Sequence, residues 1–92
     1  MKNRKTQRGF DIIEFTDSHR IECSLQKSSS VDEAVWLGCN EANPRVIVEG
    51  LGWTSIELPD QCVCNTRMHL DQDQVRELIP YLMRFAETGE IV

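Results

Sequence analysis

The sequence lacks any long run of apolar residues. No stretch approaches the roughly 20 consecutive apolar residues that a membrane-spanning helix needs. The basic first residues resemble the start of a signal peptide, but charged residues interrupt the segment that follows and leave no apolar core for such a signal. The sequence therefore predicts a protein without a membrane anchor that stays in the cytoplasm, where its four cysteines are reduced.

The sequence also lacks the motifs that mark common enzymes. It contains no G-x-S-x-G, no phosphate-binding P-loop, no H-E-x-x-H and no G-x-G-x-x-G pattern. A nucleophilic cysteine needs a histidine or another cation beside it, but the period of a strand sends Cys64 and His69 to opposite faces. We therefore predict that the protein is not an enzyme and has neither catalytic residues nor a cofactor.

The cysteines do not have the spacing of a zinc site. The chain has no C-x-x-C pair, and Cys62 and Cys64 lie in a run that reads as a strand rather than as a turn. Each cysteine also occupies a position where its predicted strand faces inward and where a small hydrophobic residue fits. We predict buried free thiols and no metal site, and a zinc-stabilised module is the weaker alternative.

Charge is unevenly distributed along the 92 residues, which suffice for one small domain. The net charge is −5, and it becomes −9 over residues 9–92 when the first eight residues are set aside. The four cations of that first segment are Lys2, Arg4, Lys5 and Arg8. We predict a flexible basic tail over residues 1–8, a single domain over 9–92, and no binding of nucleic acid, because an acidic body repels phosphates.

Hydrophobic alternation predicts an antiparallel sheet. The turn-like segments 16–19 and 50–52 each separate two strand-like runs, as in hairpins. In the last run, the period of two places Met68 and Leu70 on the core face and Arg67 with His69 on the other. The predicted strands cover residues 9–15, 20–26, 34–39, 45–49, 53–58 and 62–70.

A single helix is predicted over residues 72–88. Asp71 and Gln74 have the spacing of a capping box, Gly89 lies where a helix ends, and Pro80 predicts a bend. One apolar stripe follows the helical period: Val75, Leu78, Ile79, Leu82, Met83 and Ala86. The predicted fold class is α+β, an antiparallel sheet of about five or six strands with one C-terminal helix packed on one face. The other face is then polar, or it is a binding or dimer surface.

Polar residues outside the predicted core are candidate binding residues. The serine run, Ser28–Ser30, offers hydroxyl groups to a phosphate, and Arg67 with His69 can bind an anion. Taken alone, an ordinary loop and a solvated strand face are the favoured explanations of these residues. Each tryptophan is either buried packing or an exposed anchor. The candidate set is Lys27, Ser28, Ser29, Trp36, Arg45, Trp53, Arg67 and His69.

Four stretches carry a resemblance: SLQKSS, VWLG, TRMHL and RFAETGEI. Together they resemble a group of small proteins, without an assigned activity, that bacteriophages and prophages encode. The resemblance covers most of residues 9–92 and is most specific over 66–91. It implies a small acidic phage protein that acts in a host cytoplasm, and it carries over no catalytic or binding residue.

Two hypotheses about function follow. The first is a non-enzymatic protein that binds and inhibits or redirects a host factor, such as a nuclease or a defence complex, in the manner of anti-CRISPR proteins. The second is a small-ligand binder that sequesters a nucleotide signal through Lys27, the serine run, Arg67 and a stacking tryptophan. Free strand edges and an uncovered sheet face also predict a homodimer or a higher homo-oligomer.

Overall fold

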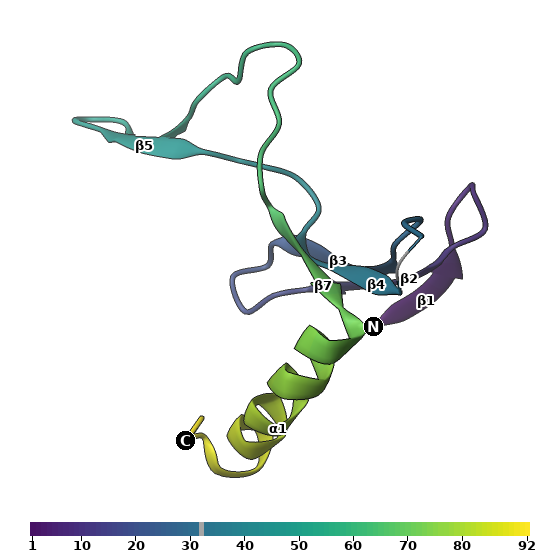
Figure 1. The fold of residues 1–92 in the computed structure, drawn as a ribbon. Coiled ribbons are helices and arrows are strands. Elements are labelled where there is room, and N and C mark those ends of the chain that lie inside the picture. The colour runs from purple at the N-terminus through teal and green to yellow at the C-terminus, as the bar shows by residue number, and fades with distance from the viewer. Residues whose placement is uncertain (32) are drawn as a thin grey trace.

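The computed structural model describes residues 1–31 and 33–92. Along these residues the strands come first, and one helix follows them (Figure 1). The elements are β1 Lys2–Lys5, β2 Asp11–Thr16, β3 Glu22–Lys27, β4 Ala34–Cys39, β5 Arg45–Val48, β6 Gly52–Ser55, β7 Arg67–Asp71 and α1 Gln72–Thr88.

Five strands form one antiparallel sheet in the order β1-β2-β3-β4-β7, and β5 pairs with β6 in a separate hairpin. Figure 1 shows this hairpin extending as an arm from one end of β7, while α1 leaves the other end. The predicted α+β class, with an antiparallel sheet and a C-terminal helix, is confirmed.

Strand register separates the sheet into two chemically different faces, because directly paired residues point to the same side. The row of Leu25, Leu37 and Met68 lies on what we call the apolar face, and the row of Gln26, Trp36 and His69 lies on the polar face. The apolar side chains on this face include Ile13, Phe15, Cys23, Leu25, Val35, Leu37, Met68 and Leu70. The polar face includes Arg4, Glu14, Ser24, Gln26, Trp36, Arg67 and His69.

The basic N-terminal segment is an edge strand where the sequence predicted a flexible tail. β1 pairs with β2, and two ion pairs cross the strands: Arg4 with Glu14, and Lys5 with Asp11. Sequence reasoning looked for apolar residues to hold this segment and overlooked that β2 supplies opposite charges and a free edge. The basic residues therefore belong to the sheet.

Strand β7 is shorter than predicted, because residues 62–65 belong to the irregular connection from the arm. It approaches β4 closely at Gly38, whose φ is +147°. A Cβ atom at Gly38 would lie 2.4 Å from the carbonyl oxygen of Thr66 and 2.8 Å from the Cα of Arg67. Only glycine therefore allows β7 to lie against β4 in this way.

The helix begins and ends as predicted. The Asp71 carboxylate accepts a hydrogen bond from the backbone N–H of Gln74 at 2.8 Å, and the Gln74 side chain accepts one from the N–H of Asp71 at 3.0 Å. Gly89 is left-handed and donates to the carbonyl of Phe85 at 2.8 Å. These bonds satisfy backbone groups that a helix leaves open at its ends.

The position of α1 differs from the prediction that it would lie across the sheet. Its main contact is with β7, and none of its residues, all of which the structure describes, is buried. Asp71 is both the last residue of β7 and the N-cap, so no connecting residue allows the chain to turn back. The edge strand thus directs the helix away from the sheet (Figure 1).

The single chain is open for its size. Its radius of gyration is 16.4 Å, whereas a compact domain of this length has about 12 Å. Among the described residues, the buried apolar side chains are those of Ile12, Cys23 and Ala34. No helix in the described part of the chain is both long and apolar enough to cross a membrane.

Candidate functional site

Trp36 lies on the polar face, in contact with two side chains of β7. Its ring centroid is 4.1 Å from that of His69, with the two planes tilted by 30°. The guanidinium carbon of Arg67 lies 5.5 Å from the indole centroid, within the range of a cation–π contact. Trp36 and the two β7 residues therefore form one aromatic and cationic cluster.

Hydrogen bonds from β3 and the segment after it hold this cluster in place. His69 Nε2 lies 2.8 Å from the hydroxyl of Ser28, and Arg67 Nη1 donates to the side-chain oxygen of Gln26 at 3.0 Å. Ser28 is buried, so its hydroxyl is a fixed partner rather than a mobile one. The bond of Arg67 uses one of its guanidinium N–H groups, and an arginine has five.

A hollow of about 480 Å³ lies beside Trp36, between the sheet and the turn from β1 to β2. Its volume is within the range of about 300–1,000 Å³ that is usual for small-molecule sites. Arg8 lies over the ring of Phe10, with 5.7 Å between the guanidinium carbon and the ring centroid. The lining residues are Arg4, Thr6, Gln7, Arg8, Phe10, Ile12, Gln26, Ser29 and Trp36.

Positive charge gathers on this face although the protein is acidic overall. Arg4 and Arg8 line the hollow, and Arg67 lies against the ring of Trp36. Glu14 offsets Arg4 through their ion pair. The site thus offers aromatic rings, hydroxyl and amide groups, and more cations than carboxylates, which favours an anionic ligand.

Ser24 adds a polar group to the same face. Its side chain is fully buried, and its hydroxyl has no hydrogen-bond partner among the described residues. Its partner across β3 and β4 is Gly38, which has no side chain to meet it. Buried hydroxyls are normally paired, so Ser24 marks an unusual position next to the cluster.

The structure brings together five of the eight predicted binding residues: Ser28, Ser29, Trp36, Arg67 and His69. Lys27 alternates to the apolar side and forms an ion pair with Glu33. Arg45 and Trp53 lie in the arm, in β5 and β6.

Sequence reasoning missed Arg4 and Arg8, because it placed them in a flexible tail. One signal was available: Arg4 and Lys5 are matched by Glu14 and Asp11 in the next predicted strand, as in a paired hairpin. Phe10 falls within the predicted strand over residues 9–15, but in the structure it precedes β2 and lines the hollow.

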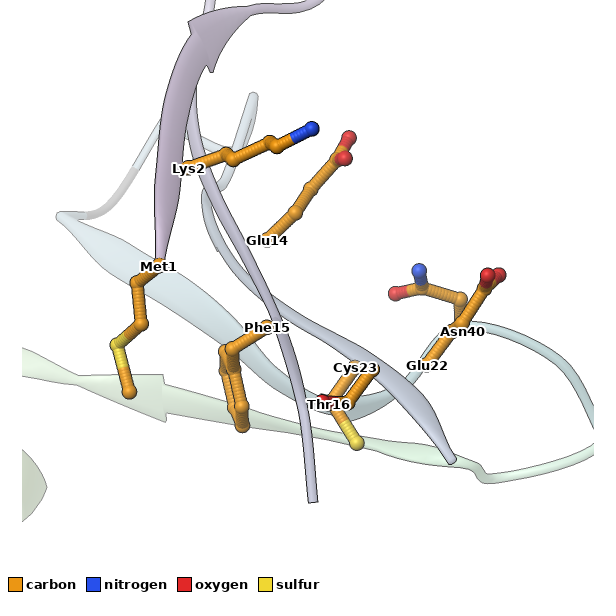
Figure 2. A pocket seen from close by; sticks show the side chains of 8 residues that line it. All are labelled: Met1, Lys2, Glu14, Phe15, Thr16, Glu22, Cys23 and Asn40. Carbon is orange, nitrogen blue, oxygen red and sulfur yellow. The ribbon is translucent and has the colours of Figure 1, made fainter. Parts of the chain in front are cut away.

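A larger hollow, of about 600 Å³, lies at the edge of the sheet where β1 begins. Figure 2 shows Lys2 extending toward Glu14, while Met1, Phe15 and Cys23 point to the other side of the strands. The hollow therefore wraps around the sheet edge and mixes opposite charges with apolar groups. This lining does not select one class of ligand.

The cysteines form two pairs. Cys23 and Cys39 face each other across β3 and β4 with 4.0 Å between sulfurs, and burial raises the pKa of the Cys23 thiol, to which the Cys39 thiol contributes. The sulfurs of Cys62 and Cys64 are 3.9 Å apart, and chiefly the hydrogen bond between the two thiols raises the pKa of Cys64. A raised pKa keeps a thiol protonated and slow to react as a nucleophile.

The prediction of buried thiols is wrong for Cys62 and Cys64, which are exposed. Strand β7 begins after them, so no inward strand face holds them. In the described part of the chain, no three His, Cys, Asp or Glu side chains come together as metal ligands do.

Searches against protein-family models, curated proteins and solved structures find no match. The resemblance to phage-encoded proteins therefore stays a prediction.

Proposed function

We propose that this protein binds an anionic small molecule with a planar ring, of the nucleotide class, on its polar face. The observation that carries this proposal is a hollow lined by Trp36, Arg4 and Arg8, with Arg67 against the ring of the same Trp36, in a protein whose net charge is −5. Arg67 lies against Trp36 and Arg8 against Phe10, which places positive charge beside aromatic surfaces on which a base can stack.

Each part of the ligand has a matching group in the site. Trp36 lines the hollow and offers an indole surface for a base to stack on, which contributes about 1–3 kcal/mol for a base on an aromatic ring. Arg67 and Arg8 supply charge-assisted hydrogen bonds to phosphate oxygens. Gln26 and Ser29 supply an amide and a hydroxyl that recognise polar edges of the ring or sugar.

Retention of the ligand is the proposed activity, in the cytoplasm of a host cell. Trp36, Arg67 and Gln26 can stack on a ligand or hydrogen-bond to it, and none of them is suited to move a proton near neutral pH. His69 belongs to the cluster, but it is held by Ser28 and Trp36 and does not line the hollow. A protein that captures a nucleotide signal without converting it needs no more than such a site, provided that it is present in sufficient amount.

Isothermal titration with purine and pyrimidine nucleotides tests this proposal. We expect a nucleotide to bind with a dissociation constant at or below the millimolar range, and inorganic phosphate or the free nucleoside to bind more weakly, because each lacks half of the ligand. Absence of binding and of any thermal shift at millimolar nucleotide would contradict the proposal.

Two arginine variants provide a matched comparison. Arg67→Ala removes a cation of the site and should weaken binding by roughly 10-fold or more. Arg45→Ala removes a cation of the arm and should leave the affinity unchanged. In a Trp53→Phe background Trp36 is the remaining tryptophan, and its fluorescence should change when the nucleotide binds. Equal losses in both arginine variants would indicate a general charge effect instead of a site.

We propose a second function, the binding of a host protein through the arm, such as a nuclease or a defence complex. Its support is that Trp53 is 67% exposed and lies beside the exposed Ile47, to which it is paired across the hairpin. A two-stranded hairpin is marginally stable by itself, so a partner that covers it would stabilise it. Aromatic anchors of this kind dominate many protein interfaces.

Affinity capture from a host lysate tests this second proposal. The wild-type protein should retain a specific host protein, and Trp53→Ala should lose it while Trp36→Ala retains it. Recovery of no partner, or of the same partner with Trp53→Ala, would count against the arm. The nucleotide titration is independent of this result, so the two proposals can fail separately.

A further inference from the structure

We infer that the apolar face of the sheet and the apolar stripe of α1 form the interface with a second copy of this chain, in which each helix covers the partner's sheet. The occupant is a second copy because the surface that needs covering belongs to the fold itself. It is more than a local patch that a single regulatory partner would use.

The amount of surface is the first argument. The chain exposes 8072 Å², whereas a monomeric protein of 10.6 kDa exposes about 5,500 Å². The excess is on the order of 2,500 Å², and obligate dimers bury about 1,000–2,500 Å² from each chain. One second copy is therefore enough to account for most of the excess.

The helix stripe is the second argument. Ile79, Leu82 and Met83 are exposed, although they follow the spacing of residues that pack against a core. A helix of 17 residues with no buried side chain is barely stable in water, because packing of one face provides most of a helix's stability in proteins. The single chain does not provide that packing.

The apolar face is the third argument, because it is the complementary surface. Leu25, Leu37 and Met68 form a row on a face that α1 of the same chain leaves uncovered. The helix is about 25 Å long, and a sheet of five strands is about 20–25 Å wide. A helix from a second copy can therefore span the sheet.

The junction of the two surfaces shows where they meet. A hollow of about 350 Å³ lies between the first turn of α1 and the sheet, with Val35, Leu70 and Val75 in its lining. The stripe and the apolar face are thus continuous on one side of the molecule. Because a two-fold axis repeats every contact, one helix-on-sheet contact covers both stripes and both sheets.

Direct contact between two helices is a poorer solution. It would cover the stripes but leave Leu25, Leu37 and the rest of the apolar face open in both copies. Reciprocal covering of sheets by helices removes both exposed surfaces with one symmetric contact.

Three residues of equal exposure make a test of this interface. In the single chain Met68 is 53% exposed, Leu82 is 54% exposed and Tyr81 is 53% exposed. Met68 is on the apolar face and Leu82 in the stripe, whereas Tyr81 lies roughly a third of a turn away from the stripe. A monomer would respond alike to Asp at all three positions.

Sedimentation velocity at micromolar concentration gives the readout, with circular dichroism to report folding. We expect the wild type and Tyr81→Asp to sediment above the mass of one chain. Leu82→Asp and Met68→Asp should each raise the dissociation constant by about 100-fold or more, because a charge would be buried without a partner. A monomeric wild type would overturn the inference.

The pattern among the variants decides the arrangement. Dissociation by Leu82→Asp but not by Met68→Asp would overturn the helix-on-sheet contact, because the sheet would then lie outside the interface. Should the Asp variants fail to fold, the Ala variants at the same three positions report through the concentration dependence of Tm. It should show a weaker assembly than that of the wild type for Leu82→Ala and for Met68→Ala. For Tyr81→Ala the concentration dependence of Tm should match that of the wild type.

Discussion

The two faces of the sheet are built from the same strands but differ in what they need. The apolar face carries rows such as Leu25 and Leu37, which lose free energy as long as water covers them. The polar face carries Trp36, Gln26 and Arg67, which are already paired with one another and can remain in water. One register of the strands thus creates a surface that must be covered and a surface that is suited to stay accessible.

This difference explains why we assign different partners to the two faces. Coverage of an apolar face is part of folding, so it must be provided by the chain itself or by a second copy. A small polar ligand arrives later and binds only if its site is already ordered. The cluster around Trp36 meets this condition through the contacts that His69 and Arg67 make with β3 and Ser28.

The largest effect is expected when a carboxylate is placed on one face of the sheet and then on the other. Leu37→Asp places a carboxylate on the apolar face and should lower the free energy of unfolding by about 3 kcal/mol or more. Gln26→Asp changes a nearby position on the polar face, where Arg67 remains as a partner. It should lower the free energy of unfolding by about 1 kcal/mol or less. Urea denaturation measures both, and equal costs would show that the faces are energetically alike.

Gly38→Ala should have the next largest effect. The added Cβ meets the backbone of Thr66 and Arg67, so either β7 moves away or the strand is strained, at a cost of about 1–3 kcal/mol. Because Arg67 moves with β7, nucleotide affinity should fall together with stability. Urea denaturation and isothermal titration measure the two effects, and a stable variant with altered affinity would mean that the site alone depends on this approach.

Asp71→Ala tests the helix at the point where the two faces end. Loss of the N-cap should cost about 1 kcal/mol, because the Gln74 N–H loses its partner. Asp71→Asn keeps a side-chain oxygen and should retain most of that stability. Circular dichroism with thermal melting measures the difference. An unchanged melting temperature for Asp71→Ala would indicate that packing in the assembly, rather than the cap, holds the helix.

The smallest effect is expected at Asp17, in the turn that joins β2 to β3 and lies on neither face. Its carboxylate accepts hydrogen bonds from the N–H groups of Ile21 at 2.9 Å and His19 at 2.8 Å, and chiefly the Ile21 bond lowers the pKa of Asp17 below its ordinary value of 3.8. A lowered folded-state pKa stabilises the fold above the ordinary pKa, and this contribution is lost as pH falls through the folded-state pKa.

Comparison of the wild type with Asp17→Asn measures this contribution. The wild type should be slightly more stable at pH 7, and the difference should disappear below the folded-state pKa of Asp17 because both side chains are then neutral. Denaturation curves of both proteins at pH 7 and at a pH below the folded-state pKa of Asp17 measure the difference. A difference that persists at low pH would show that the turn geometry, and not the charge, is responsible.

Local rules in the sequence predicted much of this fold. The capping box of Asp71 and Gln74, the end of the helix at Gly89 and the hairpin over residues 45–55 all depend on residues that are neighbours in the chain. The division of β7 into Met68 on one side and His69 on the other follows from a period of two. Such features need no knowledge of distant residues.

The site was less predictable, because its parts come from four separate segments. The sequence indicated Trp36, Arg67 and His69 as single candidates, but their meeting depends on β4 pairing with β7 across the inserted arm. Arg4 and Arg8 were missed, because a basic segment looks like a solvated tail until its edge pairing is known. Lys27 was wrongly grouped with the serine run that follows it, because the strand period places its side chain on the opposite face of the sheet.

The sequence by itself determined six of the seven strands in outline, where the helix begins and ends, and which side chains share a strand face, because steric and hydrogen-bonding preferences act over a few residues. Only the tertiary structure decided that β1 closes the sheet, that Gly38 admits β7, and that α1 departs from the sheet. These outcomes depend on which edges meet, and that depends on long-range pairing. The same pairing leaves one face apolar and open, and it gathers Trp36 with its arginines on the other.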